Sequence, residues 1–302
     1  MRVLDIGKPI TTLRFTADGQ RLVVGWWTPE EGLHLELCSF DGERFPVPLP
    51  AWYGMTYGRP ITVHPVRDIV YVAWGEWVHS FRTTEAAVVP CPTLGQANQM
   101  IVSADGTRVV LAQIVYADRA IHYQVQGVSV APTGHRVDWD RTLVAPFALG
   151  GFLPDGERFL TVDDGAVRLR AFATGEELTA RRYPTYNIND PQLSPDGRHL
   201  GIIGYSTMYL YDVPALGKPR KFASTRSFGD FRSFAFHPDG RTLAVIHGGP
   251  TLVKLYDVDT LKLRAKYSWK VGALQAVAFS PDGMLGAAGG EEGRVVLWDV
   301  DD

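Results

Sequence analysis

Cysteine is scarce in this chain of 302 residues, which contains only Cys38 and Cys91. Two cysteines cannot form the dense disulfide framework of small secreted domains. We expect no disulfide between them, because they fall in different copies of the repeat described below. Cys38 is expected to pack as a small hydrophobic side chain, and Cys91 lies near an expected outer strand. Neither residue has the sequence context of a catalytic nucleophile.

The chain also lacks a strong charge of either sign. It has 30 Lys and Arg residues against 33 Asp and Glu residues, a net charge of −3. Nucleic acids and anionic membranes are bound through concentrated basic residues, so we expect neither as a partner. No apolar run approaches the roughly 18 residues of a membrane span, and the first residues have no apolar core of signal-peptide length. We therefore expect a cytoplasmic protein.

Common catalytic motifs are missing as well. The sequence has no Gly-x-Ser-x-Gly elbow, no Gly-x-x-x-x-Gly-Lys phosphate loop, no His-Glu-x-x-His pair and no Cys-x-x-Cys pair. His64 and His237 precede prolines, which favours turn histidines over metal ligands. The acidic pairs before Gly165 and Gly293 would suit calcium, but their position between expected strands favours hairpin turns. We expect no catalytic residue, no cofactor and no metal ion.

What the sequence does contain is one phrase in seven copies. The last copy, FSPDGMLGAAGGEEGRVVLWDV, runs from Phe279 to Val300. Earlier copies begin at Phe236, Leu193 and Phe152, and more divergent ones at Val102, Val63 and Phe15. The turn aspartates assigned to the copies are Asp18, Asp68, Asp105, Asp155, Asp196, Asp239 and Asp282. Their mean spacing of about 44 residues predicts a β-propeller array.

Each copy has the chemistry of a small antiparallel sheet. Two apolar runs flank a Pro-Asp-Gly or Ala-Asp-Gly turn, and a third run follows. Such a meander cannot bury both of its faces alone, whereas radial stacking lets each sheet cover its neighbour. We therefore predict an all-β fold, a seven-bladed β-propeller of four-stranded antiparallel blades.

The copies resemble the WD-repeat family, named for the dipeptide that stands here as Trp298-Asp299. Tyr256-Asp257 and Tyr211-Asp212 occupy the same place in the two preceding copies, whereas Arg170-Ala171 and Cys38-Ser39 replace the dipeptide. No Gly-His pair precedes a repeat. The Asp-His-Ser/Thr-Trp network typical of the family is therefore expected to be absent, leaving packing to hold the blades.

The two ends of the chain predict how the ring closes. The last copy reaches Asp301-Asp302 without an outer strand, while RVLDI, from Arg2 to Ile6, is a spare strand ahead of the first copy. We infer that this segment pairs into the last blade. Residues 1–302 are thus expected to form a single domain, a monomeric propeller.

Aromatic residues gather in loops that the resemblance places on one face of the ring, its top. These loops include GWWTPEEG from Gly25, AWYGMTYGRP from Ala51 and TRSFGDFRS from Thr225. Clustered Trp, Tyr and Arg side chains are typical of interface hot spots. The partner-binding residues that we predict are Trp26, Trp27, Trp52, Tyr53, Tyr57, Arg59, Tyr186, Phe228, Phe231 and Trp269. A long insertion after Asp105, IVYADRAIHY, is a further candidate for recognition.

The resemblance implies a non-enzymatic scaffold that binds a protein or peptide through this top face. For any single ring, packing in the core or over a loop is the alternative. A propeller enzyme such as a lactonase-like hydrolase, or a small-ligand binder, would instead use the central channel. The polar residues near its inner strands are Asn98, Gln99, Asn189, Asp190 and Gln275, too few acids for a divalent cation. A third alternative is that the bottom or sides hold an assembly together.

Overall fold

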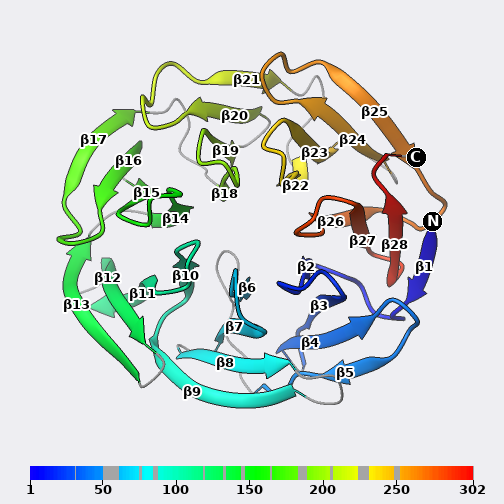
Figure 1. The fold of residues 1–302 in the computed structure, drawn as a ribbon, viewed down its shortest axis with the longest axis horizontal. Helices are drawn as coiled ribbons and strands as arrows, with labels where there is room; N and C mark the ends of the chain where they lie inside the picture. Colours follow the sequence, from blue (N-terminus) through cyan, green and yellow to red (C-terminus); the bar gives the residue numbers. More distant parts are fainter. Residues whose placement is uncertain are drawn as a thin grey trace.

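The computed structural model describes residues 1–30, 32–49, 61–74, 77–83, 88–117, 120–131, 134–143, 147–163, 165–182, 189–204, 207–223, 231–247 and 252–301. All elements within these residues are β-strands, arranged in seven four-stranded sheets. The sheets stand side by side around a centre as the blades of one ring (Figure 1). The predicted fold is therefore confirmed.

Each of the first three blades places its earliest strand at the centre and its last strand at the rim (Figure 1). Blade one consists of β2 (Thr12–Phe15), β3 (Arg21–Thr28), β4 (Gly32–Ser39) and β5 (Arg44–Pro46). Blade two consists of β6 (Ile61–Val63), β7 (Ile69–Trp74), β8 (Trp77–Thr83) and β9 (Val88–Gln96). Blade three consists of β10 (Gln99–Val102), β11 (Arg108–Ala117), β12 (Ala120–Ala131) and β13 (Gly134–Leu143).

The next three blades repeat the same meander. Blade four consists of β14 (Phe147–Phe152), β15 (Arg158–Asp163), β16 (Ala166–Ala171) and β17 (Glu177–Arg182). Blade five consists of β18 (Asn189–Leu193), β19 (His199–Ile203), β20 (Thr207–Asp212) and β21 (Arg220–Ala223). Blade six consists of β22 (Phe231–Phe236), β23 (Thr242–His247), β24 (Leu252–Asp257) and β25 (Leu263–Ser268).

Blade seven joins the two ends of the chain. It consists of β26 (Leu274–Phe279), β27 (Leu285–Gly290), β28 (Arg294–Asp299) and, outermost, β1 (Arg2–Asp5). β1 runs antiparallel to β28, with Val3 opposite Val296, and the two termini lie close together (Figure 1). Leu4 and Ile6 are buried in the core between blades one and seven. The predicted closure by the N-terminal strand is confirmed.

The turn between the first two strands of a blade explains the repeated phrase. In blade three the Ser103 hydroxyl donates to the Asp105 carboxylate over 2.6 Å, and the Thr107 amide donates to the same oxygen over 3.0 Å. Gly106 completes the turn at a φ of 72°, a left-handed conformation that suits glycine. Serine, aspartate and glycine are thus selected by turn geometry.

The turn aspartate assigned to the second copy is wrong by two residues. His64 donates its amide to the Ile69 carbonyl, just as Ser103 donates to Arg108, so Val66 holds the place of the turn aspartate. The Nδ1 atom of His64 accepts from the Val66 and Arg67 amides over 3.1 and 2.9 Å. The imidazole therefore takes the place of the missing carboxylate. His64 is a turn residue, as expected, but it is buried rather than solvated.

Buried side chains of neighbouring blades form a continuous series of cores around the ring. One core cluster joins Leu13 and Leu22 of blade one to Ala276 and Val295 of blade seven. Cys38 lies in this cluster and is buried, as the sequence predicts, at the position that Trp298 holds in blade seven. Packing of this kind is the main apolar contribution to the fold.

Blade four departs from the expectation that packing alone holds the blades. Arg170 stands where other copies have the aromatic residue of the dipeptide, and its Nε donates to the buried Thr161 hydroxyl over 3.0 Å. The same guanidinium and that of Arg168 both pair with the buried carboxylate of Asp163. Arginine thus replaces the aromatic ring by forming a buried polar network, because burying the Asp163 carboxylate requires compensating partners.

Candidate functional site

Exposed hydrophobic side chains gather at the hairpin ends of the first three blades. Trp27, at the end of β3, is 39% exposed, and Trp77, at the start of β8, is 44% exposed. Tyr116 and Ile121, on β11 and β12, are 70% and 48% exposed. All four lie at the ends of the strands opposite the Asp-Gly turns. We call Trp27, Trp77, Tyr116 and Ile121 the hairpin rim.

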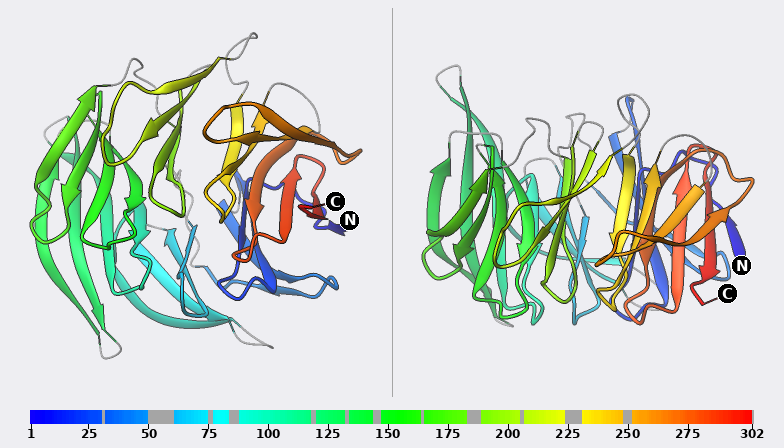
Figure 2. Two further views of the ribbon diagram at one scale, coloured as in Figure 1. Left: turned by 45° about the horizontal axis from the view of Figure 1, so that its top comes forward. Right: turned by 90° about the horizontal axis from the view of Figure 1, so that it is seen from above.

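The hairpin formed by β11 and β12 is the most prominent feature of this end. It extends beyond the other blades, at the upper left of the right-hand view in Figure 2. Ile114 stands opposite Tyr123, and Tyr116 stands opposite Ile121, so the four side chains form two cross-strand pairs. All four also line the mouth of the central channel. The insertion identified in the sequence therefore presents an apolar surface there.

The central channel is a cavity of about 1180 Å³ surrounded by the inner strands of the ring. Most of the residues that line it are apolar, and Phe15, Phe152 and Phe236 are among them. Gln99 serves the structure, because its amide donates to the Phe147 carbonyl over 3.1 Å and accepts from the Leu149 amide over 3.0 Å. It thereby links blade three to blade four.

Other polar residues proposed for a channel site also have structural partners. Asn98 accepts a hydrogen bond from the Ile114 amide over 2.7 Å, and Gln275 donates to Glu291 over 2.7 Å. Asp190 accepts from Gln192 over 3.1 Å. Within the described ranges, no group of three or more His, Cys, Asp or Glu residues is arranged to hold a metal ion. In the two acidic hairpins the described carboxylates also have partners: Asp163 is paired with arginines, Glu291 accepts from Gln275, and Glu292 pairs with Arg294.

Two of the predicted partner-binding residues are not at the surface. Trp26 is buried in the core, with its ring stacked on His34 at 5.4 Å between centroids. Phe231 is also buried and borders the channel. The β3 residues from Leu22 to Trp26 are buried on both faces of the strand, because neighbouring blades cover both faces, whereas Trp27 is exposed near the end of the strand. The prediction of direct partner contact is therefore not supported for Trp26 and Phe231.

Trp269 has an intermediate position. Its ring is stacked on Tyr267, with an interplanar angle of 2°, and lies 4.9 Å from the ring of Trp298. It is partly buried against the core of blades six and seven. The remaining predicted residues, Trp52, Tyr53, Tyr57, Arg59, Tyr186 and Phe228, lie outside the described residues.

Three residues of the hairpin rim were not among the predicted contacts. Trp77 follows the Gly-Glu of WGEWVHS, and Tyr116 and Ile121 flank the centre of IVYADRAIHY. The available signal was an aromatic or branched residue at a strand end next to a polar hairpin tip. Sequence alone does not give the strand register that turns these side chains outward.

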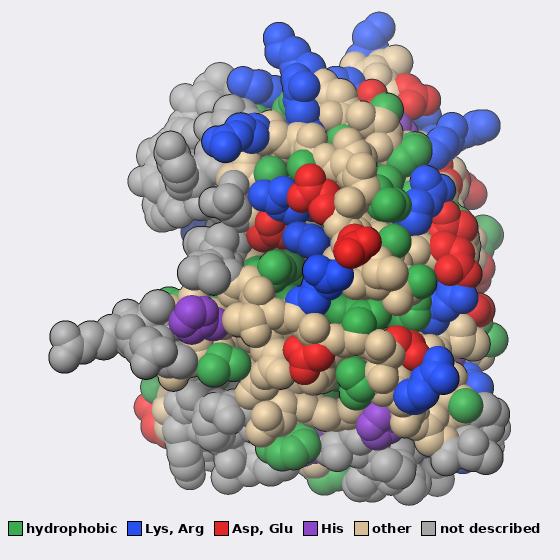
Figure 3. All heavy atoms as spheres, turned by 90° about the vertical axis from the view of Figure 1, so that its left-hand side faces the viewer, with side chains coloured by type: hydrophobic (Ala, Val, Ile, Leu, Met, Phe, Trp, Pro, Cys, Tyr) green, Lys and Arg blue, Asp and Glu red, His purple; other side chains and the backbone are tan. Residues whose placement is uncertain are grey.

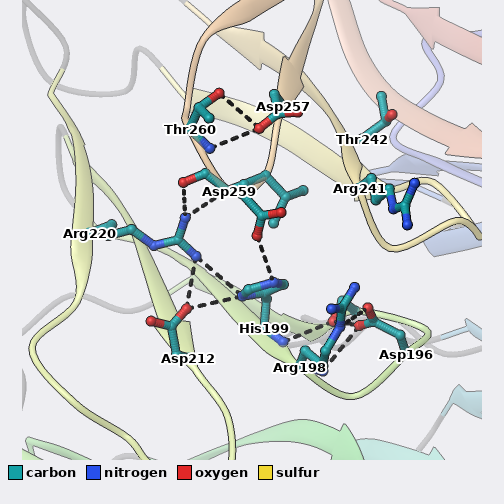
Figure 4. Close-up of polar contacts among 12 residues, drawn as sticks. Asp196, Arg198, His199, Asp212, Arg220, Arg241, Thr242, Asp257, Asp259 and Thr260 are labelled. Carbon is teal, nitrogen blue, oxygen red and sulfur yellow. Dashed lines mark hydrogen bonds and ion pairs between the residues drawn. The ribbon is translucent and has the colours of Figure 1, made fainter.

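The opposite end of blades five and six carries a polar cluster (Figure 4). Arg220 donates to Asp212 of its own blade over 2.8 Å and to the Asp259 carbonyl of blade six over 2.8 Å. His199, which is buried, lies 3.2 Å from Asp212 and 3.2 Å from Arg220. In blade six, Asp257 accepts from the Thr260 hydroxyl and amide, both over 2.8 Å. These contacts join adjacent blades.

The outer face of the ring is polar where Figure 3 shows it. Basic and acidic side chains alternate there, with hydrophobic side chains scattered singly among them. The outermost strand of blade four, β17, is exposed along its whole length. Single exposed apolar residues are normal on protein surfaces, so this side offers less apolar contact area than the hairpin rim.

The ring, its repeated turns and its closing strand define a seven-bladed β-propeller. A family model described as "WD domain, G-beta repeat" matches residues 263–299, which include the three inner strands of blade seven. This match supports the resemblance to the WD-repeat β-propeller family that the repeated dipeptide indicates. The described residues contain no helix of the length and apolar character needed to cross a membrane.

Curated relatives match part of the chain. A segment of 144 residues is 28% identical to the serine-threonine kinase receptor-associated protein of Gallus gallus, covering 48% of this chain and 40% of that protein. A segment of 68 residues is 34% identical to the small ribosomal subunit protein RACK1 of Neurospora crassa, covering 22% of each. The matches thus span less than half the length of these relatives.

One solved structure matches nearly the whole chain. The β-propeller domain of Cps50 (Swd1) from Myceliophteria thermophila superposes with a TM-score of 0.71. The likeness covers 97% of this chain and 98% of that one at 14% sequence identity. At this identity the likeness supports the fold alone.

Proposed function

We propose that this protein is a scaffold that binds a protein or peptide partner through the hairpin rim. The observation that carries the proposal is the grouping of four exposed hydrophobic side chains, three of them aromatic, at one end of three consecutive blades. Exposed Trp and Tyr side chains bury large areas on binding and are enriched among hot spots. The similarity to RACK1 and to a receptor-associated protein agrees with a role in protein assembly.

Rigidity supports binding at this surface. Strands anchored in four-stranded sheets hold Trp27, Trp77 and Tyr116, and strand pairing fixes their positions before a partner arrives. Preorganised contact residues reduce the ordering cost of association. The partner that fits has an apolar surface able to cover aromatic rings. The proposal includes a monomeric propeller acting in the cytoplasm, which size-exclusion chromatography and cell fractionation would test.

Affinity capture with matched variants tests this function. The purified chain and its Trp27→Ala, Trp77→Ala variant would be compared as baits, after circular dichroism has shown that both are folded. A Val66→Ala, Met284→Ala variant is the control, because both residues are exposed hydrophobics at the opposite end of the ring. The proposal predicts a protein captured by the wild type and the control and lost with the tryptophan variant. Equal capture by all three baits would contradict it.

The tryptophan variant should also lose a measurable amount of affinity for the partner. Truncation of a hot-spot tryptophan costs about 2 kcal/mol or more, which is about a thirtyfold rise in Kd. Once the captured protein is known, calorimetry with purified components would measure this change. A change of less than about twofold would remove the hairpin rim from the binding surface.

A further inference from the structure

One level of the central channel contains a single charged side chain. The residues that stand two positions before the turn in each blade, and therefore share a level, all line the cavity. They are Arg14, Thr62, Ile101, Gly151, Gln192, Ala235 and Ala278. Three of the seven are glycine or alanine, which leaves space at this level. The guanidinium of Arg14 is thus set among small and neutral neighbours.

Arg14 has no carboxylate partner among the described residues. Its one hydrogen bond runs from Nη1 to the carbonyl of its own neighbour Leu13, over 2.8 Å. The edge of the guanidinium formed by Nε and Nη2 has no acceptor within the described ranges. Arg44, Arg168 and Arg264, by contrast, each pair with a carboxylate. An arginine inside a protein normally requires such a partner.

The surroundings of Arg14 disfavour its positive charge, but the guanidinium stays protonated. The side chain is partly accessible from the channel, yet burial lowers the pKa of the guanidinium to about 10. Arg14 is therefore still a cation at neutral pH. A second charged residue, Asp190, also lines the channel. Its carboxylate accepts from Gln192 over 3.1 Å and forms no ion pair with Arg14.

We propose that Arg14 is the anchor of a ligand site in the channel that takes a carboxylate attached to an apolar body. The free Nε and Nη2 edge matches the two oxygens of a carboxylate, the geometry of a bidentate pair. A single guanidinium suits a single negative charge, whereas a phosphate dianion calls for more than one cation. The channel lining is mostly apolar, with Ile101, Ala235 and Ala278 at the level of Arg14, and it suits the apolar part. The site is separate from the hairpin rim.

Two sources could present this carboxylate, and calorimetry with the purified full chain distinguishes them. The free-acid probe is 4-phenylbutyrate, with 4-phenylbutyramide as its uncharged match. The peptide probe is an end-blocked Ala-Leu-Glu-Leu-Ala peptide, with Gln in place of Glu as its match. We expect at least one acid to bind the wild type and its amide to bind about tenfold more weakly or not at all. Binding of neither acid would overturn the proposal.

Variants of Arg14 give the second test. Arg14→Gln should weaken binding of the acid by about tenfold or more, because a charge-assisted pair is lost. Arg294→Gln, an exposed arginine of blade seven, is the control and should leave binding unchanged. Equal binding by Arg14→Gln and the wild type would show that the acid binds elsewhere. The hairpin-rim variant Trp27→Ala should retain the site, so failure here is separable from failure of the scaffold function.

Thermal unfolding supplies a readout that does not depend on the choice of probe. If Arg14 is the site of an anionic ligand, Arg14→Met should have an equal or higher Tm than the wild type in buffer without carboxylates. A partly buried cation without a carboxylate partner disfavours folding. A variant that unfolds several degrees lower would show that the guanidinium stabilises the fold through its present contacts. That result would also overturn the proposal.

Discussion

The Nη2 atom of Arg220 donates a hydrogen bond to the Oδ1 atom of Asp212 over 2.8 Å. Asp212 is the second residue of the repeated dipeptide in blade five. The Nη1 atom of the same arginine donates to the Val258 and Asp259 carbonyls of blade six over 2.5 and 2.8 Å. One side chain therefore joins the dipeptide of one blade to the backbone of the next (Figure 4).

This relationship predicts that Arg220→Lys destabilises the ring. A lysine carries a single ammonium and cannot donate to both blades with the geometry of a guanidinium. We expect a loss of about 1–2 kcal/mol in the free energy of unfolding, measured by urea denaturation. Arg264→Lys is the matched control, because the hydrogen bonds of Arg264 to described residues, Asp257 and Thr242, lie within its own blade. A smaller loss for Arg220→Lys than for Arg264→Lys would contradict the interblade role.

Closure by β1 predicts a contrast between two neighbouring hydrophobic residues. Ile6 is buried between blades one and seven, whereas Val3 on β1 is exposed. Ile6→Ala should lower the free energy of unfolding by about 2 kcal/mol or more, through lost burial and a residual cavity. Val3→Ala should change it by about 0.5 kcal/mol or less. Comparable effects in chemical denaturation would mean that the N-terminal segment does not close the ring.

Folding shifts the pKa values of two aspartates near the turns in opposite directions, so their charges should affect stability in opposite ways. The Ser103 hydroxyl, followed by the Thr107 amide, lowers the pKa of Asp105 to about 2. An unfolded aspartate has a pKa of about 3.9. Because the folded value is the lower one, ionised Asp105 stabilises the fold above pH 4, and this contribution is lost as the pH falls from about 4 to about 2. Burial, followed by the charge of Asp18, instead raises the pKa of Asp68.

Asparagine variants separate the two cases. Asp105→Asn should lower the Tm at pH 7, and the difference from the wild type should shrink as the pH approaches 2. Asp68→Asn removes a charge that folding disfavours, so it should leave the Tm at pH 7 unchanged or raise it. Differential scanning calorimetry across this pH range measures both. A Tm difference for Asp105→Asn that does not vary with pH would rule out the carboxylate charge as its cause.

Burial also predicts that the Cys38 thiol is unreactive in the folded protein. Burial, followed by the nearby charge of Glu36, raises the pKa of the Cys38 thiol to about 12. Since the thiolate is the reactive form, Cys38 should resist alkylation by iodoacetamide at pH 8 in the native protein and react fully in urea. A Cys91→Ser background leaves Cys38 as the one thiol to be labelled. Rapid native labelling would show that blade one opens at this position.

The ring itself was predictable because its signals are local. An Asp-Gly turn repeats in six of the seven blades, as at Asp105, and a spare strand at Arg2 matches a missing one in the last blade. The divergent second copy, from Val63, is the exception. His64 takes the role of the aspartate in its turn, so the sequence of this copy has no marker of the correct register and points to Asp68 instead.

The candidate site was less predictable, because it depends on which way side chains face. Trp26 and Trp27 are adjacent in one strand, yet Trp26 is covered by the core and Trp27, one position nearer the strand end, is exposed. Arg14 gave no signal in the sequence, where it is one arginine within an apolar strand. Its unpaired state depends on the residues of the other blades at its level, and only the assembled ring brings them together.

Site-specific photo-crosslinking tests the scaffold account most directly. A benzoylphenylalanine placed at Trp77 in the hairpin rim would be compared with one at Met284, an exposed position at the opposite end of the ring. Crosslinked proteins from cells expressing each variant would be identified by mass spectrometry. The account predicts a specific adduct from position 77 that is absent from position 284. Adducts from position 284 alone would place the partner on the opposite face and contradict it.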